Sequence, residues 1–368
     1  MFKEIGSDFW LMEFQDQEKK NNKFEMYGIT QQYQTIYTSS GRGAFSLILD
    51  HIKPAHRTAL LPLYFCESIA LPLISRSYEI FFYETNKDLT TNVASLLEQI
   101  EKHNPGLVYF ISYFGFDTLA NTRKYYPYIR NKNSIIIEDF THLLFSKVDK
   151  SGADYYLASL RKWFALPDGG IAISAKERID LKKTGTHEAL VELNLNAMHL
   201  KHKYVQNPVP GLKDRYRKLF ASLEELLNKD CGFYQMSDTS RGLLSNMNFN
   251  ELCNLRRENY QYMLERLAGI PEIKPLFPVL DQDASPLGMP VYVEGVSRDG
   301  LYEYLGEHSI GLFIHWQEIL GDLRFKDVPE VYGMAGRMLT LTCDQRTSQN
   351  QLDYLLECLK KGIALLQG

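Results

Sequence analysis

The sequence predicts an α/β protein with a mostly parallel sheet that carries helices on both faces. Over the first two hundred residues, short β-branched or aromatic runs alternate with helical patterns, an order typical of strand–helix–strand units. Residues 107–112 (LVYFIS) and 134–138 (SIIIE) are apolar along their length, as in strands that are covered on both faces. At 368 residues the chain exceeds what one hydrophobic core usually organises, so we expect two domains.

The elements of the first half follow from these runs. We expect strands at 57–63, 78–83, 107–112, 134–138 and 171–174, and helices at 45–51, 94–103 and 122–131. Right-handed crossovers bring the carboxyl ends of parallel strands to one edge of the sheet, where ligands bind.

The second half predicts helices and a smaller domain. Residues 179–227 have a polar helical pattern that is interrupted at 207–211 (NPVPG), and 249–267 predicts one long helix joining two domains. Strands at 290–293 and 338–341 and helices at 300–307 and 350–366 indicate a closing α+β domain. We therefore expect a large domain over 1–245, with the N-terminal segment, and a small domain over 246–368.

Composition excludes several classes of partner. Lys plus Arg number 41 and Asp plus Glu 45, a net charge of −4 that gives no electrostatic reason to expect nucleic acid or an anionic membrane. The first ten residues lack the apolar stretch of a signal peptide, and the most apolar segment, 59–74, is too short to cross a bilayer. The five scattered cysteines indicate reduced thiols and no zinc site, so we expect a cytoplasmic protein without a metal.

The first candidate site is an anion-binding turn. Residues 39–44 (SSGRGA) precede the predicted helix at 45–51. The free backbone N–H groups of a helix start, with nearby hydroxyls, suit a phosphate. An ordinary helix cap remains the alternative.

The second candidate is a carboxylate after an apolar strand. Asp139 directly follows the run at 134–138, where an acid is costly unless a positive group faces it. A protonated heterocyclic nitrogen would serve, and His142, three residues on, is placed to reach the same ligand. A capping Asp with a packed His remains the alternative.

The third candidate is a lysine. Lys162 lies between strands and is followed by Trp163 and Phe164, neighbours that favour the neutral, nucleophilic amine. Ser159 is placed to bind the same anion as the first turn, and the glycines at 169 and 170 allow a tight return into the sheet. A solvated lysine is the alternative.

The fourth candidate is an aromatic strand end. Residues 61–67 (LPLYFCE) present Tyr64 and Phe65, whose faces suit a flat conjugated ring. Aromatic residues at such positions more often belong to the core.

Together these segments resemble fold-type-I pyridoxal-5′-phosphate (PLP) enzymes, most closely the nucleotide-sugar aminotransferase (DegT/DnrJ) family. The resemblance covers most of the chain and rests on 39–44 (SSGRGA), 60–65 (LLPLYF), 78–84 (YEIFFYE), 108–115 (VYFISYFG), 137–142 (IEDFTH) and 161–170 (RKWFALPDGG). It implies a large domain with a seven-stranded, mostly parallel sheet between helices, a smaller C-terminal α+β domain, and a homodimer.

The resemblance also implies roles for single residues. Lys162 would form the Schiff base with PLP, Asp139 would pair with the pyridinium nitrogen, and His142 would lie near the ring. The residues implied for the phosphate are Ser40, Gly41, Arg42 and Ser159; those for ring stacking are Tyr64 or Phe65; those for the substrate are Trp316 and Arg346.

Three positions depart from the family pattern. The serine that the family places five residues before the lysine is Leu157, and the stacking aromatic is Cys66. The segment that should carry Asn-x-Arg, at 232–237, reads GFYQMS and contains neither residue. We therefore expect phosphate anchoring to be rewired or weaker.

The function implied is transfer of an amino group from an amino acid such as glutamate to a keto sugar attached to a nucleotide. One alternative is transamination of a free amino acid or small amine, which Ser159-x-x-Lys162 and Arg346 favour mildly. Another is a degenerate homologue with a structural or regulatory role, against which the joint presence of Lys162 and Asp139 argues.

Overall fold

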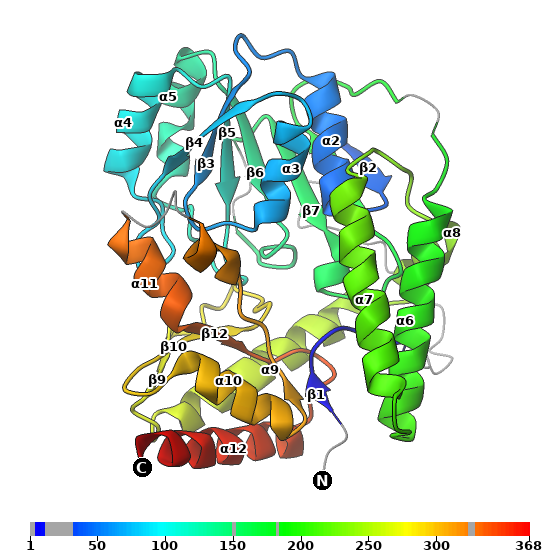
Figure 1. Ribbon diagram of the computed structural model, residues 1–368. Coiled ribbons are helices and arrows are strands. Elements are labelled where there is room, and N and C mark those ends of the chain that lie inside the picture. The colour runs from blue at the N-terminus through cyan, green and yellow to red at the C-terminus, as the bar shows by residue number, and fades with distance from the viewer. Residues whose placement is uncertain (1–3, 12–31, 149–151, 182–183, 323–327) are drawn as a thin grey trace.

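In the computed structural model, the part of the chain that the structure describes comprises residues 4–11, 32–148, 152–181, 184–322 and 328–368. It holds a seven-stranded sheet, a three-stranded sheet and a two-stranded pair, with helices packed around them (Figure 1). No helix within these ranges combines the length and apolar composition needed to span a bilayer.

The large sheet has the mostly parallel order that the sequence predicts. Its strands, in spatial order, are β2 (Gln34–Thr38), β8 (Gly170–Ser174), β7 (Tyr155–Ser159), β6 (Ile135–Asp139), β5 (Leu107–Ile111), β3 (Thr58–Pro62) and β4 (Glu79–Tyr83). The strands from β7 to β4 are mutually parallel, whereas β8 runs antiparallel to both β7 and β2.

Both faces of this sheet are buried, which explains why its strands read as continuous apolar runs. Successive side chains alternate between faces: Leu60, Val108 and Ile136 pack towards α4 (Val93–His103) and α5 (Tyr126–Asn131). On the opposite face, the neighbouring residues Leu61, Tyr109 and Ile137 pack towards α2 (Gly41–His51). Burial of each large apolar side chain contributes about 1.5–3 kcal/mol to the driving force for folding.

The helix predicted at 122–131 is divided in the structure. A short 3-10 turn, η2 (Arg123–Tyr125), precedes α5, and Pro127 lies in the first turn of α5. Pro127 has no backbone N–H to donate to the carbonyl four residues back, at Arg123, so an α-helical hydrogen bond is missing where the helix type changes. The other short elements of this half are η1 (Glu67–Ile69) and α3 (Ala70–Ile74).

A helical hairpin follows the sheet. α6 (Glu188–Gln206) and α7 (Leu212–Lys229) lie side by side, as the two long green helices of Figure 1 show, and the predicted break at 207–211 separates them. Gly211 makes this turn with φ of 80°, a left-handed conformation that favours glycine. After α8 (Asp238–Ser245), the long helix α9 (Phe249–Leu267) has the bounds that its apolar spacing predicts.

The C-terminal part is an α+β unit. Its sheet consists of the antiparallel strands β9 (Ile273–Pro275), β10 (Met289–Val293) and β12 (Met338–Leu341). Between β10 and β12 the chain forms α10 (Arg298–Glu307), η4 (Gln317–Gly321) and α11 (Pro329–Arg337), and α12 (Gln349–Gln367) follows β12. Its core is continuous with the α2 face of the large sheet.

The N-terminal segment differs from expectation. β1 (Ile5–Gly6) pairs in parallel with β11 (Ile310–Gly311) of the C-terminal part and not with the large sheet. A strand of two residues has no periodicity by which the sequence could reveal its partner. The division of the chain between 245 and 246 stays a prediction.

Candidate active site

The candidate residues of the large sheet meet at the carboxyl ends of two neighbouring parallel strands. Asp139 is the last residue of β6, and Ser159 is the last residue of β7. Lys162 ends the 3-10 turn η3 (Leu160–Lys162), which follows β7 at once. The charge of Lys162 acts on both Asp139 and His142 and contributes to the pKa shifts of both. The three predicted catalytic residues therefore follow the ends of two neighbouring strands, where the charge of Lys162 acts on the other two.

Asp139 is a buried carboxylate with hydrogen bonds but no cation in contact. Its Oδ2 accepts the Tyr109 hydroxyl at 2.8 Å, and its Oδ1 accepts the Thr141 N–H at 2.7 Å. Burial raises the pKa of Asp139, and the hydrogen bonds from Thr141 and Tyr109 and the charge of Lys162 oppose this only in part. Within the described ranges no arginine, lysine or histidine forms an ion pair with Asp139, so a protonated ring nitrogen would supply the missing charge.

Two neutral histidines lie beside the lysine. The His142 Nδ1 accepts the Phe114 N–H at 3.3 Å, so the proton of the neutral ring is on Nε2. Burial, together with electrostatic coupling to His315 and the charge of Lys162, holds the pKa of His142 well below its usual value. Burial and Lys162 likewise lower the pKa of His315 to about 3. The His315 Nδ1 is hydrogen-bonded with the Thr340 hydroxyl at 2.8 Å, so in both rings Nδ1 is already used and only Nε2 is left for a ligand.

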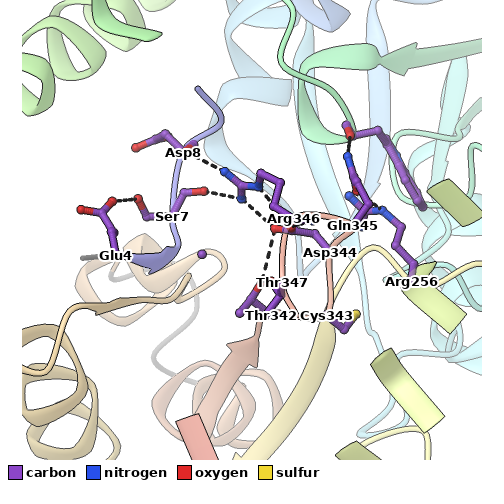
Figure 2. A network of polar contacts seen from close by, with 12 residues as sticks. Glu4, Ser7, Asp8, Arg256, Thr342, Cys343, Asp344, Gln345, Arg346 and Thr347 are labelled. Atoms are coloured by element: carbon purple, nitrogen blue, oxygen red, sulfur yellow. Dashed lines mark hydrogen bonds and ion pairs between the residues drawn. The ribbon is translucent and has the colours of Figure 1, made fainter. Parts of the chain in front are cut away.

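Trp163, the residue after Lys162, is held by contacts with three other residues. The Trp163 Nε1 donates to the Thr141 carbonyl at 2.6 Å, and the Gln345 amide donates to the Trp163 carbonyl at 3.0 Å. The Arg256 guanidinium lies 4.6 Å from the centre of the Trp163 ring and donates to Gln345 at 2.8 Å (Figure 2). Lys162 itself remains exposed. Its backbone is thus held rigidly while its amine stays accessible.

The turn before α2 is built for an anion. Ser40 is the N-cap, and its Oγ accepts the Gly43 N–H at 3.0 Å, which is the capping role that the sequence left open. The N–H groups of Gly41 and Arg42 open the helix and find no acceptor among the described residues. Gly170 lies against this turn, because a Cβ there would be 2.3 Å from the Ser40 carbonyl carbon. The second glycine of the pair thus lets β8 approach the helix start.

Two arginines and one acid stand beside this turn. The Arg42 Nη2 is 3.1 Å and the Arg161 Nη2 3.5 Å from the carboxylate of Glu224, which comes from α7. Ser159 lies close by, with its Cβ 3.1 Å from the position that a Cβ on Gly41 would take. Sequence reasoning did not single out Arg161 or Glu224, since no local pattern joins residues so far apart in the chain.

A cavity of about 430 Å³ opens between the large sheet, the helical hairpin and the C-terminal part. Ser159, Lys162 and Arg346 are the predicted site residues that line it, and Arg161, Glu224 and His315 line it as well.

The predicted aromatic residues lie in the core beside the histidines and do not line this cavity. The Tyr64 hydroxyl donates to the His315 carbonyl at 3.1 Å, and the Trp316 ring packs edge-on against Tyr64 with centroids 4.5 Å apart. Trp316 also stacks on His142, with ring planes 9° apart, and Phe65 packs against Phe82. Their contacts to a cofactor or substrate stay predictions.

Arg346 anchors the N-terminal segment. Its Nε and Nη2 donate to the Asp344 carboxylate at 3.0 and 2.6 Å. Its Nη1 and Nη2 donate to the backbone carbonyls of Asp8 and Ser7 at 3.0 and 2.9 Å, as Figure 2 shows. Most of its donors are therefore used within the protein, which leaves little of the guanidinium for a substrate carboxylate.

No protein-family model and no curated protein sequence matches the chain, but solved structures do. Spr1654 of Streptococcus pneumoniae, described as a sugar aminotransferase, matches in its PLP form with a TM-score of 0.64 and 16% identity, over 92% of this chain and 89% of that one. The aminotransferase TlmJ of Streptoalloteichus hindustanus matches with a TM-score of 0.65 and 15% identity, over 91% and 87%. A DegT DnrJ EryC1 StrS aminotransferase of Brucella abortus matches with a TM-score of 0.57 and 16% identity, over 89% of this chain and 85% of that one. The chain has the fold of these aminotransferases. The predicted fold class is confirmed.

The residues present in this aminotransferase fold fit PLP. Among the described residues Asp139 has no cationic partner, which a protonated ring nitrogen would supply, and the N–H groups of Gly41 and Arg42 have no acceptor, which a phosphate would supply. Lys162 presents an amine to the cavity, as the aldehyde of PLP requires.

Proposed function

We propose that the protein is a PLP-dependent aminotransferase that moves an amino group from an amino acid to a keto sugar attached to a nucleotide. The observation that carries this proposal is the accessible amine of Lys162 next to a buried carboxylate, Asp139, that has no cationic partner in the described structure. Sugar aminotransferases among the structural neighbours support the choice of substrate class.

The chemistry divides between cofactor and protein. PLP, when bound, supplies the electron sink for the reaction. Lys162 would hold the cofactor through its Nζ, and its amine, when free, would serve as the base that takes up and returns a proton at the substrate carbon that carries nitrogen. Asp139 would favour a proton on the ring nitrogen of the cofactor, and the His142 Nε2–H would be left to orient a ligand oxygen.

The cofactor assignment is tested by the absorbance of the purified protein reconstituted with PLP. We expect the yellow colour of PLP bound to a lysine, its loss in Lys162→Ala, and no change in Lys360→Ala, which alters an exposed lysine of α12. A protein that binds no PLP under these conditions contradicts the proposal and favours the degenerate homologue.

The substrate assignment is tested by two half-reactions. Amino acid donors should convert the cofactor to its amino form, and a nucleotide-linked keto sugar should restore the original spectrum. Restoration by keto acids alone would instead favour the free amino acid reaction. The contacts of Arg346 with Asp344, Ser7 and Asp8 weigh against that alternative, because Arg346 was one of the two residues that favoured it.

We also propose a cytoplasmic homodimer. The resemblance to fold-type-I enzymes supports it, since these complete their active sites across a dimer interface. Light scattering coupled to gel filtration measures the mass directly, and a monomer at micromolar concentration would contradict the proposal.

A further inference from the structure

One acid, Glu224, pairs with two arginines: Glu224 and Arg161 line the cavity, and Arg42 reaches Glu224 from the start of α2. Arg42 comes from the first turn of α2, Arg161 from the turn that carries Lys162, and Glu224 from the middle of α7. The Nε of each arginine is buried and has no partner among the described residues. A carboxylate thus uses only part of the donor capacity that the two guanidinium groups offer.

The charged groups around Glu224 carry more positive than negative charge. The Glu224 side chain is 54% exposed, and its partial burial would raise its pKa, but the charges of Arg161, Arg42 and Lys162 outweigh this and lower the pKa to about 2. Glu224 is therefore a single negative charge facing three positive ones. A phosphate dianion in its place would balance the cluster better and offers three terminal oxygens to the guanidinium donors.

The position is the one that a cofactor phosphate needs. Ser159 lies against Gly41, and the N–H groups of Gly41 and Arg42 have no acceptor among the described residues. Leu157 stands where the family has a phosphate-binding serine, and 232–237 holds neither Asn nor Arg. The two arginines thus provide the anchoring charge that these positions lack.

We propose that Arg42 and Arg161 clamp the phosphate of PLP and that Glu224 occupies this clamp until the phosphate displaces it. This inference rests on the proposed function for the identity of the ligand. Glu224 shares its face of α7 with Arg217, Phe220 and Ala221, which also line the cavity. Displacement of Glu224 by the phosphate would therefore couple cofactor binding to the side of the cavity that α7 forms, where the substrate would lie.

The test is a set of equilibrium titrations of the full-length apoprotein with PLP, pyridoxal and inorganic phosphate. Glu224→Gln should tighten PLP and phosphate by about threefold or more, because the competing charge is gone. Pyridoxal, which has no phosphate, should bind unchanged. Glu225→Gln is the matched control, since Glu225 is exposed and pairs only with Lys229 in the described structure.

The arginine variants complete the set. Arg42→Met and Arg161→Met should each weaken PLP and phosphate by about tenfold or more and leave pyridoxal unchanged. Arg161→Lys, which keeps the charge and removes the fork, should fall between wild type and Arg161→Met. Thermal melts of every variant identify any that fails to fold.

Two results overturn the clamp. One is a Glu224→Gln protein that binds PLP and phosphate no tighter than wild type, and the other is an equal loss of pyridoxal binding in the arginine variants. A wild type that binds PLP but fails these tests leaves the proposed function standing. If the wild type binds no PLP, but phosphate binding changes in the variants as expected, the result contradicts the proposed function and still supports a phosphate clamp formed by Arg42 and Arg161.

Discussion

The hydroxyl of Tyr109 donates a hydrogen bond to the Oδ2 of Asp139 over 2.8 Å, and both side chains are buried. Tyr109 pairs with Ile137 and Ile111 with Asp139 in the parallel register of β5 and β6, so Tyr109 and Asp139 lie on the same face of the sheet. A tyrosine stabilises the carboxylate without adding charge. A cationic group of a bound ligand can therefore still pair with the Asp139 carboxylate.

The first prediction concerns this hydrogen bond. Tyr109→Phe should weaken PLP binding by about tenfold or more, since a hydrogen bond to a charged group contributes about 1.5–3 kcal/mol. Titration of the apoprotein with PLP measures the change. Tyr156→Phe is the control, because it removes a buried hydroxyl that contacts the Ala153 N–H on the opposite face. Equal affinity losses in the two variants would count against a specific role for Tyr109.

The second prediction concerns Asp139 and pH. Because burial raises its pKa, the folded protein protonates Asp139 more readily than the unfolded chain does, so this group makes stability fall as pH rises through the interval between the two pKa values. Asp139→Asn should remove that fall, stabilise the apoprotein at neutral pH by about 1 kcal/mol, and weaken PLP binding. Urea unfolding of the wild type and of Asp139→Asn at acidic and neutral pH measures the change in the free energy of unfolding. An apoprotein destabilised at neutral pH would mean that the carboxylate is already paired.

The third prediction concerns the glycine at the helix start. Gly170→Ala places a Cβ 2.3 Å from the Ser40 carbonyl carbon, so either β8 or the turn must move. We expect a loss of about 1–3 kcal/mol in stability and a clear loss of PLP affinity. Gly242→Ala in α8 has open space around it and should be neutral or stabilising. Similar behaviour of the two variants would show that the close approach has no consequence.

The fourth prediction concerns the anchoring of the N-terminal segment. Lys201 is fully buried, and its Nζ lies 3.0 Å from Glu4, which also accepts the Tyr216 hydroxyl at 2.6 Å. Lys201→Met leaves the buried Glu4 with Lys213, 3.6 Å away, as its remaining cationic partner in the described structure, and should destabilise the protein by about 1–3 kcal/mol. The double variant Lys201→Met, Glu4→Gln should recover much of the loss. Denaturant unfolding measures both, and a single variant as stable as wild type would refute the pairing.

The fifth prediction separates two roles of Arg346. If this residue anchors the segment, Arg346→Lys loses the fork to Asp344 and the contacts with Ser7 and Asp8, so cleavage near the N-terminus by a protease should become faster. The KM for the amino donor should change little. A large rise in that KM at unchanged protease resistance would instead assign Arg346 to the substrate.

Much of the fold could be predicted because its signals are local. The strands β5 and β6 are apolar runs buried on both faces, and α9 and β12 have the bounds that their patterns predict. Asp139 was found because an acid after such a run marks the end of a strand. Tyr109 was missed although alternation along the strand carried a signal, since it lies two residues before Ile111 on the face that Asp139 shares.

Other features had no local signal. Arg42 and Glu224 are separated by 182 positions, and only the packing of α7 against the end of the sheet joins them. The pairing of β1 with β11 involves two residues on each side, too few for a pattern. The anchoring of Arg346 likewise depends on carbonyl groups of the N-terminal segment, which no side-chain pattern reveals.

The most direct test of the account is to reduce the PLP-loaded protein with borohydride and to map the modified peptide by mass spectrometry. The account predicts a single pyridoxyl group on Lys162 and none in Lys162→Ala. A label on another lysine, such as the buried Lys201, or bound PLP that reduction attaches to no lysine, would contradict it.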